Sequence, residues 1–441
     1  MTMSAVEQTA RKQATPKVAY LTSRFPKVTE TFILYEILEL ERQGLPVEVF
    51  ALVREHEHVV HPEAKAVVER THYSSFISGA VLSAQVYWLV RRPGAYLHTW
   101  WQALRGNISS PNFLARALAI VPQAALFARQ MQDLGVSHIH AHWATHPALS
   151  AYVIRQLTGL PYSFTAHAHD IYVERPMLEE KILQSSFVVL KTKYNQQLLH
   201  EWYGATADEK TVVIHYGNDL SVFKPRPAKE RRGPFTIVCV ASLQDYKGHP
   251  YLVEACAQLK ARGVDFRCLC IGEGEDRPKI EAQIAQLGLQ QQVLLLGHQP
   301  RNRVAELIAE ADVMAMPSII TNSGKMEGLP LVLQEALATE LPVVATAISG
   351  IPELIEHEHT GLLVPERDGQ ALAAALGRIH DDPALGRRLG ATGREKVLNE
   401  FDLRHNVAAL RRLLIQDWAS TPTGARRPVL SEALSSEHRE A

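Results

Sequence analysis

Residues 324–338 read Gly-Lys-Met-Glu-Gly-Leu-Pro-Leu-Val-Leu-Gln-Glu-Ala-Leu-Ala, a glycine-containing turn that runs into a helix. We expect the helix to start near Pro330, because proline has a pre-set φ and lacks an amide that would be unpaired there. The free amides and positive dipole of a helix start favour an anion. Glu327 precedes the helix and Glu335 lies inside it, so carboxylates that accept hydrogen bonds from sugar hydroxyls would flank a diphosphate cradle. The segment alone fits a capped surface helix with a solvated glutamate equally well.

Short apolar strands alternate with helical patterns along the rest of the chain. Such strands, when separated by helices, predict parallel sheets that are covered on both faces. Right-handed crossovers then give an α/β protein with two doubly wound, Rossmann-like domains. The expected strands are Lys17–Ser23, Pro46–Val53, His138–Trp143, Tyr162–Ala168, Phe187–Lys191 and Val212–Tyr216, then Phe235–Ala241, Phe266–Ile271, Val293–Leu296, Val313–Met316 and Val343–Thr346.

A proline- and charge-rich segment, 224–234, separates the two halves and is expected to be a linker. The first domain then covers 17–223 and the second covers 235–400. The polar ends of the chain, 1–16 and 419–441, are expected to be disordered.

Composition limits the function further. The chain has 441 residues and a formal net charge of -1, so it has no overall charge that would attract nucleic acid. No uninterrupted apolar run is long enough to span a bilayer, and residues 1–17 lack the apolar core of a secretory signal. These features predict a cytoplasmic protein. We interpret the four cysteines as reduced core residues and not as a metal site.

Ligands of open α/β sheets bind beyond the carboxyl ends of the strands. In the second half, these ends carry Lys247, which could place a charge on a phosphate, and Gly272 with Gly274, which would let backbone approach a ligand. Each of these features alone is weak, and a lone lysine is more often an ordinary surface residue. Together with the Glu327 loop, they predict one phosphate-binding edge.

At this point the chain resembles family-4 retaining glycosyltransferases of the GT-B architecture, over about residues 17–418. The resemblance is carried by Glu327-Gly328-Leu329-Pro330 with Glu335-Ala336, Lys247-Gly248, Val293–Gly297, Ala311-Asp312-Val313, Pro317-Ser318, Gly350-Ile351-Pro352-Glu353 and Gly361-Leu362-Leu363-Val364. It implies transfer of a sugar from a nucleotide-diphosphate donor, and a C-terminal helix over 401–418 that crosses back to the first domain.

The resemblance also implies roles for single residues on the donor side. Glu335 would bind the ribose, Glu327 would lie by the hexose and Lys247 would bind the diphosphate. The backbone around Arg303–Val304 would meet the base. The backbone of Gly328, Leu329 and Pro330 would lie near the sugar or phosphate. Gly272 and Gly274 are further candidates for donor binding.

The first domain is similar to colanic-acid-type transferases, which build surface polysaccharides. Residues 23–32, Ser-Arg-Phe-Pro-Lys-Val-Thr-Glu-Thr-Phe, resemble a loop of that subgroup, with Thr29 in place of serine. A helix N-cap at Thr29, with Glu30 in the first turn, explains the same residues. The segments His140–Trp143 and Thr165–Asp170 also match. The resemblance places His167 and Asp170 nearest the reacting sugar, and Arg24, Thr29, Glu30 and His142 on the acceptor side.

One departure concerns charge. The family's usual Gly-Arg pair is Ala241-Ser242 here, so Lys325 and Arg24 are the candidates to help Lys247 balance the diphosphate. No Asp-x-Asp pair of the kind that holds a catalytic metal is found. We therefore expect no metal and no cofactor besides the donor, with leaving-group stabilisation by lysine and helix amides.

Three alternatives remain open. The segment Val81–Gln130 has tryptophans near arginines, which fits buried domain helices or a stretch that rests on the inner face of the membrane. The acceptor could be a glycan or a lipid-linked glycan. A GT-B nucleotide-sugar epimerase or a non-catalytic nucleotide-sugar-binding relative would keep the same donor residues.

Overall fold

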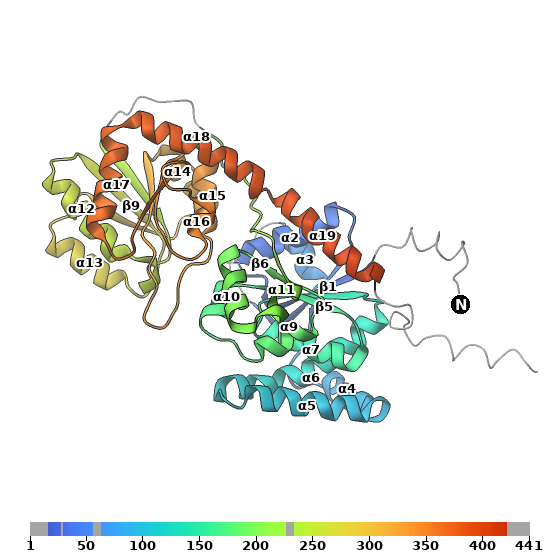
Figure 1. The fold of residues 1–441 in the computed structure, drawn as a ribbon. Coiled ribbons are helices and arrows are strands. Elements are labelled where there is room, and N and C mark those ends of the chain that lie inside the picture. Colours follow the sequence, from blue (N-terminus) through green and yellow to red (C-terminus); the bar gives the residue numbers. More distant parts are fainter. Residues whose placement is uncertain (1–15, 28–29, 56–62, 226–232, 421–441) are drawn as a thin grey trace, which may run out of the picture.

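The computed structural model describes residues 16–27, 30–55, 63–225 and 233–420 (Figure 1). Most of the ends predicted to be disordered, 1–16 and 419–441, and most of the predicted linker, 224–234, lie outside these ranges. Ala419 and Ser420 are an exception to the prediction, because they form the last residues of the C-terminal helix. Two parallel sheets, each covered by helices, form two Rossmann-like domains that face each other. The predicted α/β fold with two doubly wound domains is therefore confirmed.

The first sheet has seven parallel strands in the order β3-β2-β1-β4-β5-β6-β7. Its central strands are buried along their whole length, as their apolar sequences predict. The chain order reverses between β1 and β4, where ligands of such sheets bind. The strands are β1 (Val18–Phe25), β2 (Val47–Arg54), β3 (His72–Tyr73), β4 (His138–His142), β5 (Tyr162–Ala166), β6 (Val188–Leu190) and β7 (Thr211–Val213).

The second sheet has six parallel strands in the order β10-β9-β8-β11-β12-β13. Its switch point lies between β8 and β11, whose carboxyl ends deliver the predicted donor loops. The strands are β8 (Phe235–Val240), β9 (Phe266–Ile271), β10 (Val293–Gly297), β11 (Val313–Met316), β12 (Val343–Thr346) and β13 (Leu362–Val364).

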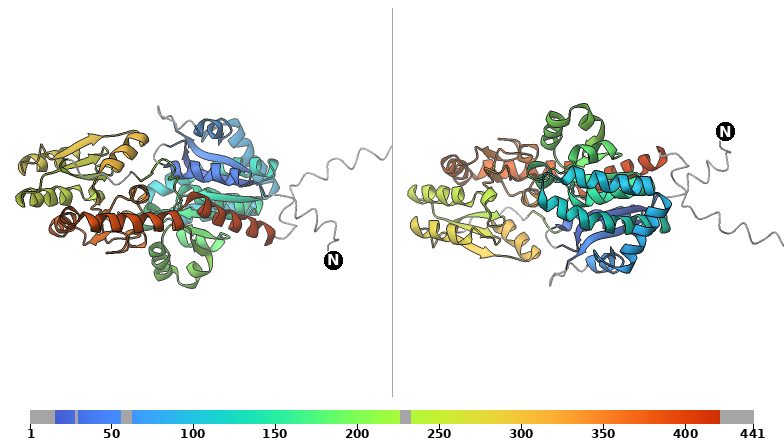
Figure 2. Two further views of the ribbon diagram at one scale, coloured as in Figure 1. Left: turned by 90° about the horizontal axis from the view of Figure 1, so that it is seen from above. Right: turned by 90° about the horizontal axis from the view of Figure 1, so that it is seen from below.

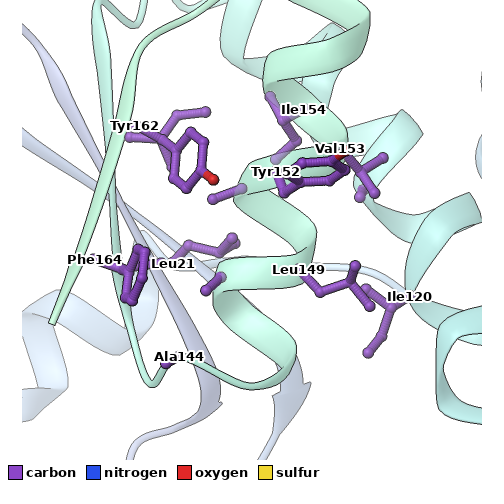
Figure 3. Close-up of a cluster of buried hydrophobic side chains, with 14 of the residues drawn as sticks. Leu21, Ile120, Ala144, Leu149, Tyr152, Val153, Ile154, Tyr162 and Phe164 are labelled. Atoms are coloured by element: carbon purple, nitrogen blue, oxygen red, sulfur yellow. The ribbon is translucent and has the colours of Figure 1, made fainter. Parts of the chain in front are cut away.

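Helices of the first domain cover both faces of its sheet. In the core, Phe164 of β5 lies on one side of α7, and Leu149 on the other side of α7 points toward Ile120 of α6 (Figure 3). These helices are α2 (Thr31–Arg42), α3 (Ala64–Glu69), α4 (Gly79–Arg91), α5 (Pro93–Asn107), α6 (Pro111–Asp133), α7 (His146–Thr158), α8 (Ala168–Tyr172), α9 (Leu178–Gln184), α10 (Lys193–Tyr203) and α11 (Ala205–Lys210).

The chain crosses back to the first domain at its carboxyl end, as the long red helix of Figures 1 and 2 shows. Val407, Leu410 and Leu414 of α19 are buried in the same cluster as Ile33 and Ile37 of α2. The helices of the second half are η2 (Asp245–Lys247), α12 (His249–Ala261), α13 (Arg277–Gln286), α14 (Arg301–Glu310), α15 (Leu331–Ala338), α16 (Ile351–Leu354), α17 (Gly369–Asp381), α18 (Pro383–Glu400) and α19 (Leu403–Ser420).

Two helix starts differ from expectation by one residue. Pro330 has ψ 121°, so it is the extended N-cap of α15 and the helix begins at Leu331. Glu30 likewise precedes α2 and does not lie in its first turn. Thr29, the expected cap of α2, lies outside the described residues.

Candidate active site

A cavity of about 360 Å³ lies between the two domains, at the carboxyl ends of both sheets. The second domain supplies the Glu327 loop and the start of α15, and the first domain supplies aromatic side chains and a lysine. The side chains that line it include Phe32, Trp143, His167, Tyr172, Lys191, Asn195 and Tyr216 from the first domain, and Tyr246, Lys247, Met316, Lys325, Glu327, Leu329 and Pro330 from the second.

Lys247 and Glu327 form an ion pair on the wall of this cavity. Burial lowers the pKa of the Lys247 ammonium, but the Glu327 carboxylate outweighs burial and holds that pKa above its usual value. Gly248 fixes the turn after Lys247: its φ is +68°, and an added Cβ would lie 1.8 Å from the carbonyl oxygen of Pro317. Only glycine fits this close approach, so the turn and the position of Lys247 depend on it.

Gly272 and Gly274 lie against the backbone that carries Lys247. A Cβ on Gly272 would meet the Ala241 carbonyl oxygen at 2.1 Å, and one on Gly274 would meet the Leu243 oxygen at 2.2 Å. Neither glycine lines the cavity. The structure therefore places them behind the donor loop, where they let two backbone segments touch.

Lys325 is the second cation of the donor side and lies near Lys247. The ammonium groups of both lysines approach the ring of Tyr246, at 4.5 Å for Lys325 and 4.8 Å for Lys247. Arg24, the other candidate for charge balance, pairs with Glu55 at 3.0 Å and does not line the cavity. Lys325 is thus the better placed of the two candidates.

Glu335 lies on α15 and does not line the cavity. It lies beside Asn218, which follows β7 in the chain. Its Oε1 accepts a hydrogen bond from Asn218 at 3.4 Å. Burial raises the pKa of the Glu335 carboxyl, against the effects of Asn218 and the charge of Arg301. Arg301 also donates to the carbonyl of Asp219 at 2.7 Å and to the Tyr35 hydroxyl of the first domain at 3.3 Å. Val304, one turn along α14, packs in the core of the second domain.

His167 ends a chain of buried polar side chains in the first domain. The imidazole Nδ1 of His167 lies 2.6 Å from the Tyr216 hydroxyl, and its Nε2 lies 3.4 Å from Nδ1 of His142. The Nε2 of His142 lies 2.8 Å from Oε1 of Glu36, and that oxygen also accepts from the Tyr20 hydroxyl at 2.7 Å. Of these hydrogen-bonded side chains, only His167 and Tyr216 line the cavity. His142 therefore affects the cavity through His167.

The charge of Glu36 determines which group donates in its contact with His142. Burial alone would raise the pKa of the Glu36 carboxyl, but His142 and Lys191 outweigh burial and hold that pKa well below its usual range. A carboxylate only accepts, so Nε2 of His142 donates to Oε1 of Glu36. Burial, with the nearby His142 and Lys191, lowers the pKa of His167 well below its usual value. A neutral His167 has one donor and one acceptor ring nitrogen, and its Nδ1 faces Tyr216.

Asp170 is buried and holds the loop that carries His167. Its Oδ2 accepts from the backbone amides of Ala144 at 2.7 Å and His167 at 3.1 Å. Burial raises the pKa of the Asp170 carboxyl to about 7, against these amides and the charge of Lys181. Asp170 does not line the cavity, so the structure gives it a positioning contact with the His167 backbone.

Glu30 lies at the entrance to α2, next to the cavity wall. It pairs with Lys27 at 2.5 Å, and the indole of Trp143 donates to it at 3.4 Å. Trp143 in turn packs on His167, with ring centroids 4.3 Å apart. Glu30 thus orients an aromatic side chain of the acceptor side.

The donor atoms of Glu36, His140 and His142 lie within 4.8 Å of one another and form a candidate metal site. Both ring nitrogens of His140 already lie within hydrogen-bonding distance of Ser163 and Thr165. Lys191 supplies a positive charge 3.8 Å from Glu36. These contacts fit a hydrogen-bonded network better than a site for a cation.

Three residues that line the cavity, Lys191, Tyr172 and Tyr216, are not among the predicted site residues. Lys191 follows a buried strand, as Lys247 does, and that position was the available signal. Tyr216 and Tyr172 carry no local signal, because their contacts depend on how the domains fold. The Tyr172 hydroxyl, for example, lies 2.9 Å from Ser349 of the other domain.

Comparisons with known proteins agree with this geometry. The family model described as "Glycosyl transferases group 1" matches residues 223–396. The chain is 30% identical over 411 residues to a putative colanic acid biosynthesis glycosyltransferase, WcaL, of Salmonella typhimurium, covering 90% of this chain and 98% of that protein. An amylovoran biosynthesis glycosyltransferase, AmsK, of Erwinia amylovora is 38% identical over 194 residues, or 44% of this chain and 48% of that one.

Solved structures share the fold at low identity. A glycosyltransferase from Rickettsia africae matches with a TM-score of 0.70 and 20% identity, over 93% of this chain and all of that one. HepE of Anabaena, solved in complex with UDP, matches with a TM-score of 0.66 and 18% identity, over 91% of this chain and all of that one.

Proposed function

Since this chain belongs to the group 1 glycosyl transferases and has the GT-B fold, we propose that it moves a hexose from a nucleotide-diphosphate sugar to a glycan or lipid-linked glycan acceptor. We further propose that the product is a surface polysaccharide, since similar proteins carry colanic acid and amylovoran names. The observation that carries the proposal is a cavity with lysines on its donor wall and a histidine opposite.

The second domain would bind the donor. Lys247, Lys325 and the first amides of α15 would surround the diphosphate, because they bring positive charge and free N–H groups to one wall. Glu327 would turn from Lys247 toward a sugar hydroxyl. Glu335, beside Asn218, would accept from the ribose hydroxyls.

The first domain would bind the acceptor and the reacting face of the sugar. Neutral His167 would offer its Nδ1, which now faces Tyr216, to a sugar hydroxyl. The one carboxylate on the cavity wall among the described residues, Glu327, is paired with Lys247. We therefore assign no covalent nucleophile and propose retention by front-face attack, with the leaving phosphate taking the acceptor's proton.

Two lysines near the leaving group support a reaction that needs no metal ion and no cofactor besides the donor. A leaving diphosphate gains charge in the transition state, and preformed cations stabilise that charge. We place the reaction in the cytoplasm, because all four cysteines are free and buried. An epimerase or a binding protein is not favoured, since the relatives named above are transferases.

A donor screen tests the proposal. UDP-, GDP- and ADP-sugars are compared by thermal shift, because a bound ligand raises the melting temperature by mass action. The stabilising donor is then incubated with and without acceptor glycan, in the presence of EDTA. We expect nucleoside diphosphate and an extended glycan. Epimerised donor without acceptor would contradict transfer.

A further inference from the structure

Helices α4 and α5 present an apolar surface to solvent. They form the outer layer of the first domain on α6, as the view from below in Figure 2 shows. Their inner residues are buried; Trp88 of α4, for instance, donates to the carbonyl of Ala125 in α6 at 2.8 Å. Large apolar side chains point the other way: Ile77 is 85% exposed, Val90 78% and Trp101 53%. The outward face, here called the α4–α5 face, also includes Leu82, Val86, Leu89, Leu97 and Ile108.

The charge of this region has one sign. Residues 71–132 contain neither aspartate nor glutamate, although the whole chain has 47 acidic residues. The same segment holds five arginines, and no carboxylate in the described part of the chain forms an ion pair with them. Arg105 lies over the ring of Trp101, 5.0 Å from its centroid. The arginines are Arg91, Arg92, Arg105, Arg116 and Arg129.

We propose that the α4–α5 face docks on the surface of an anionic lipid bilayer. Aliphatic and tryptophan side chains enter the boundary between headgroups and acyl chains, and arginines attract the anionic headgroups. A second copy of the chain fits less well, because a two-fold contact would set the same positive face against itself. The two helices lie along the surface and do not cross the membrane.

The neighbouring helix α6 supports docking over insertion. Its length and composition would allow it to cross a membrane, but 56% of its apolar window is buried inside the protein. Gln123 of α6 is fully buried and donates to the Leu52 carbonyl of the sheet at 2.8 Å. Helix α6 is therefore a core helix that fixes α4 and α5 to the domain.

The end of α5 contacts the segment that follows α8. At the end of α5, the Asn107 amide lies 3.2 Å from the sulfur of Met177, a few residues after the helix that carries Asp170. Exposed Ile108 follows directly. Docking would thus hold one edge of the acceptor domain at the lipid surface, where a lipid-linked acceptor would be found if the proposed function is right.

Vesicle flotation of the full chain tests the docking without donor or acceptor, so its outcome is independent of sugar transfer. We expect binding to phosphatidylcholine vesicles that contain an equal share of phosphatidylglycerol, much weaker binding to pure phosphatidylcholine, and release at high salt. Val90→Glu with Trp101→Glu should reduce binding at least tenfold. Arg91→Gln and Arg105→Gln should each reduce it about fivefold.

Matched controls lie on the second domain. Leu398→Glu and Arg387→Gln replace exposed residues of α18 and should leave vesicle binding unchanged. Thermal melting identifies any variant that fails to fold; the arginine variants, which keep the apolar residues, then provide the test. Equal binding by wild type and both sets of variants would overturn the proposal. So would a wild-type dimer that Val90→Glu dissociates while no vesicle is bound.

Discussion

The Lys247 ammonium and the Glu327 carboxylate are in direct contact across the donor wall of the cavity. The family resemblance implies that Lys247 binds the diphosphate and Glu327 the hexose. Without a donor, these two side chains neutralise each other's charge. A donor that binds here must share Lys247 with Glu327 or replace one partner of the pair. The pair therefore links donor affinity to the local stability of the loop.

Lys247→Ala should lower donor affinity about tenfold or more. The variant loses a charge-assisted hydrogen bond to phosphate and leaves Glu327 largely buried without its partner. Titration calorimetry with the nucleoside diphosphate of the preferred donor measures the change. Lys279→Ala removes an exposed lysine of the same domain and serves as control. Wild-type affinity in Lys247→Ala would remove Lys247 from the donor site.

Lys325→Ala should reduce turnover more than donor binding, because charge on the leaving phosphate grows in the transition state. Lys325 lines the cavity near Lys247, whereas Ser242 stands where the family has arginine. Adding Ser242→Arg to the Lys325→Ala variant should restore part of the turnover. Steady-state kinetics with and without Mg²⁺ decide the matter: a silent Lys325→Ala together with strong stimulation by metal would refute this charge balance.

His167→Ala should lower turnover while nucleotide affinity stays nearly unchanged, because His167 faces the cavity from the acceptor domain. Glu36→Gln should have a smaller effect of the same kind, since Glu36 does not line the cavity and contacts His167 through His142. His405→Ala, at an exposed position of α19, is the control. Parallel losses of turnover and nucleotide affinity in His167→Ala would instead place this residue on the donor.

Asp170→Asn should change how stability depends on pH. Burial raises the pKa of Asp170 to about 7 in the folded protein, whereas an aspartate in the unfolded chain has a pKa of about 3.9. Its stabilising contribution is thus complete below about pH 4 and is lost as pH rises to 7, because the folded state binds the extra proton. The amide keeps an acceptor for the two backbone amides but does not titrate. Wild type should therefore lose stability relative to Asp170→Asn by a few kcal/mol between pH 4 and 7; parallel denaturation curves would contradict the buried carboxyl.

Much of the fold could be predicted because its strands are continuous apolar runs. β9, β11 and β12 begin and end where the sequence places them. The short strands β3 and β13 were missed, since two or three residues give no periodic signal. The family and the GT-B fold are confirmed by the relatives and structural neighbours.

The site was only partly accessible to sequence reasoning. Turn residues such as Gly248 and charged strand ends such as Lys247 carry local signals that a reader of the sequence can find. Glu36 carries none, because it occupies an ordinary polar position of a helix and is buried only when α2 packs over β4. The sequence predicts that glycine at position 272 lets the backbone approach a ligand. In the structure, its missing side chain instead leaves room for the backbone of the donor loop.

The anomeric configuration of the new glycosidic bond tests the central claim most directly. The product made from the preferred donor and acceptor is purified, and its configuration is assigned by NMR from the anomeric proton and carbon couplings. Front-face transfer in the cavity between Glu327 and His167 predicts that the product keeps the configuration of the donor sugar. An inverted bond would contradict both this mechanism and the roles proposed for the two residues.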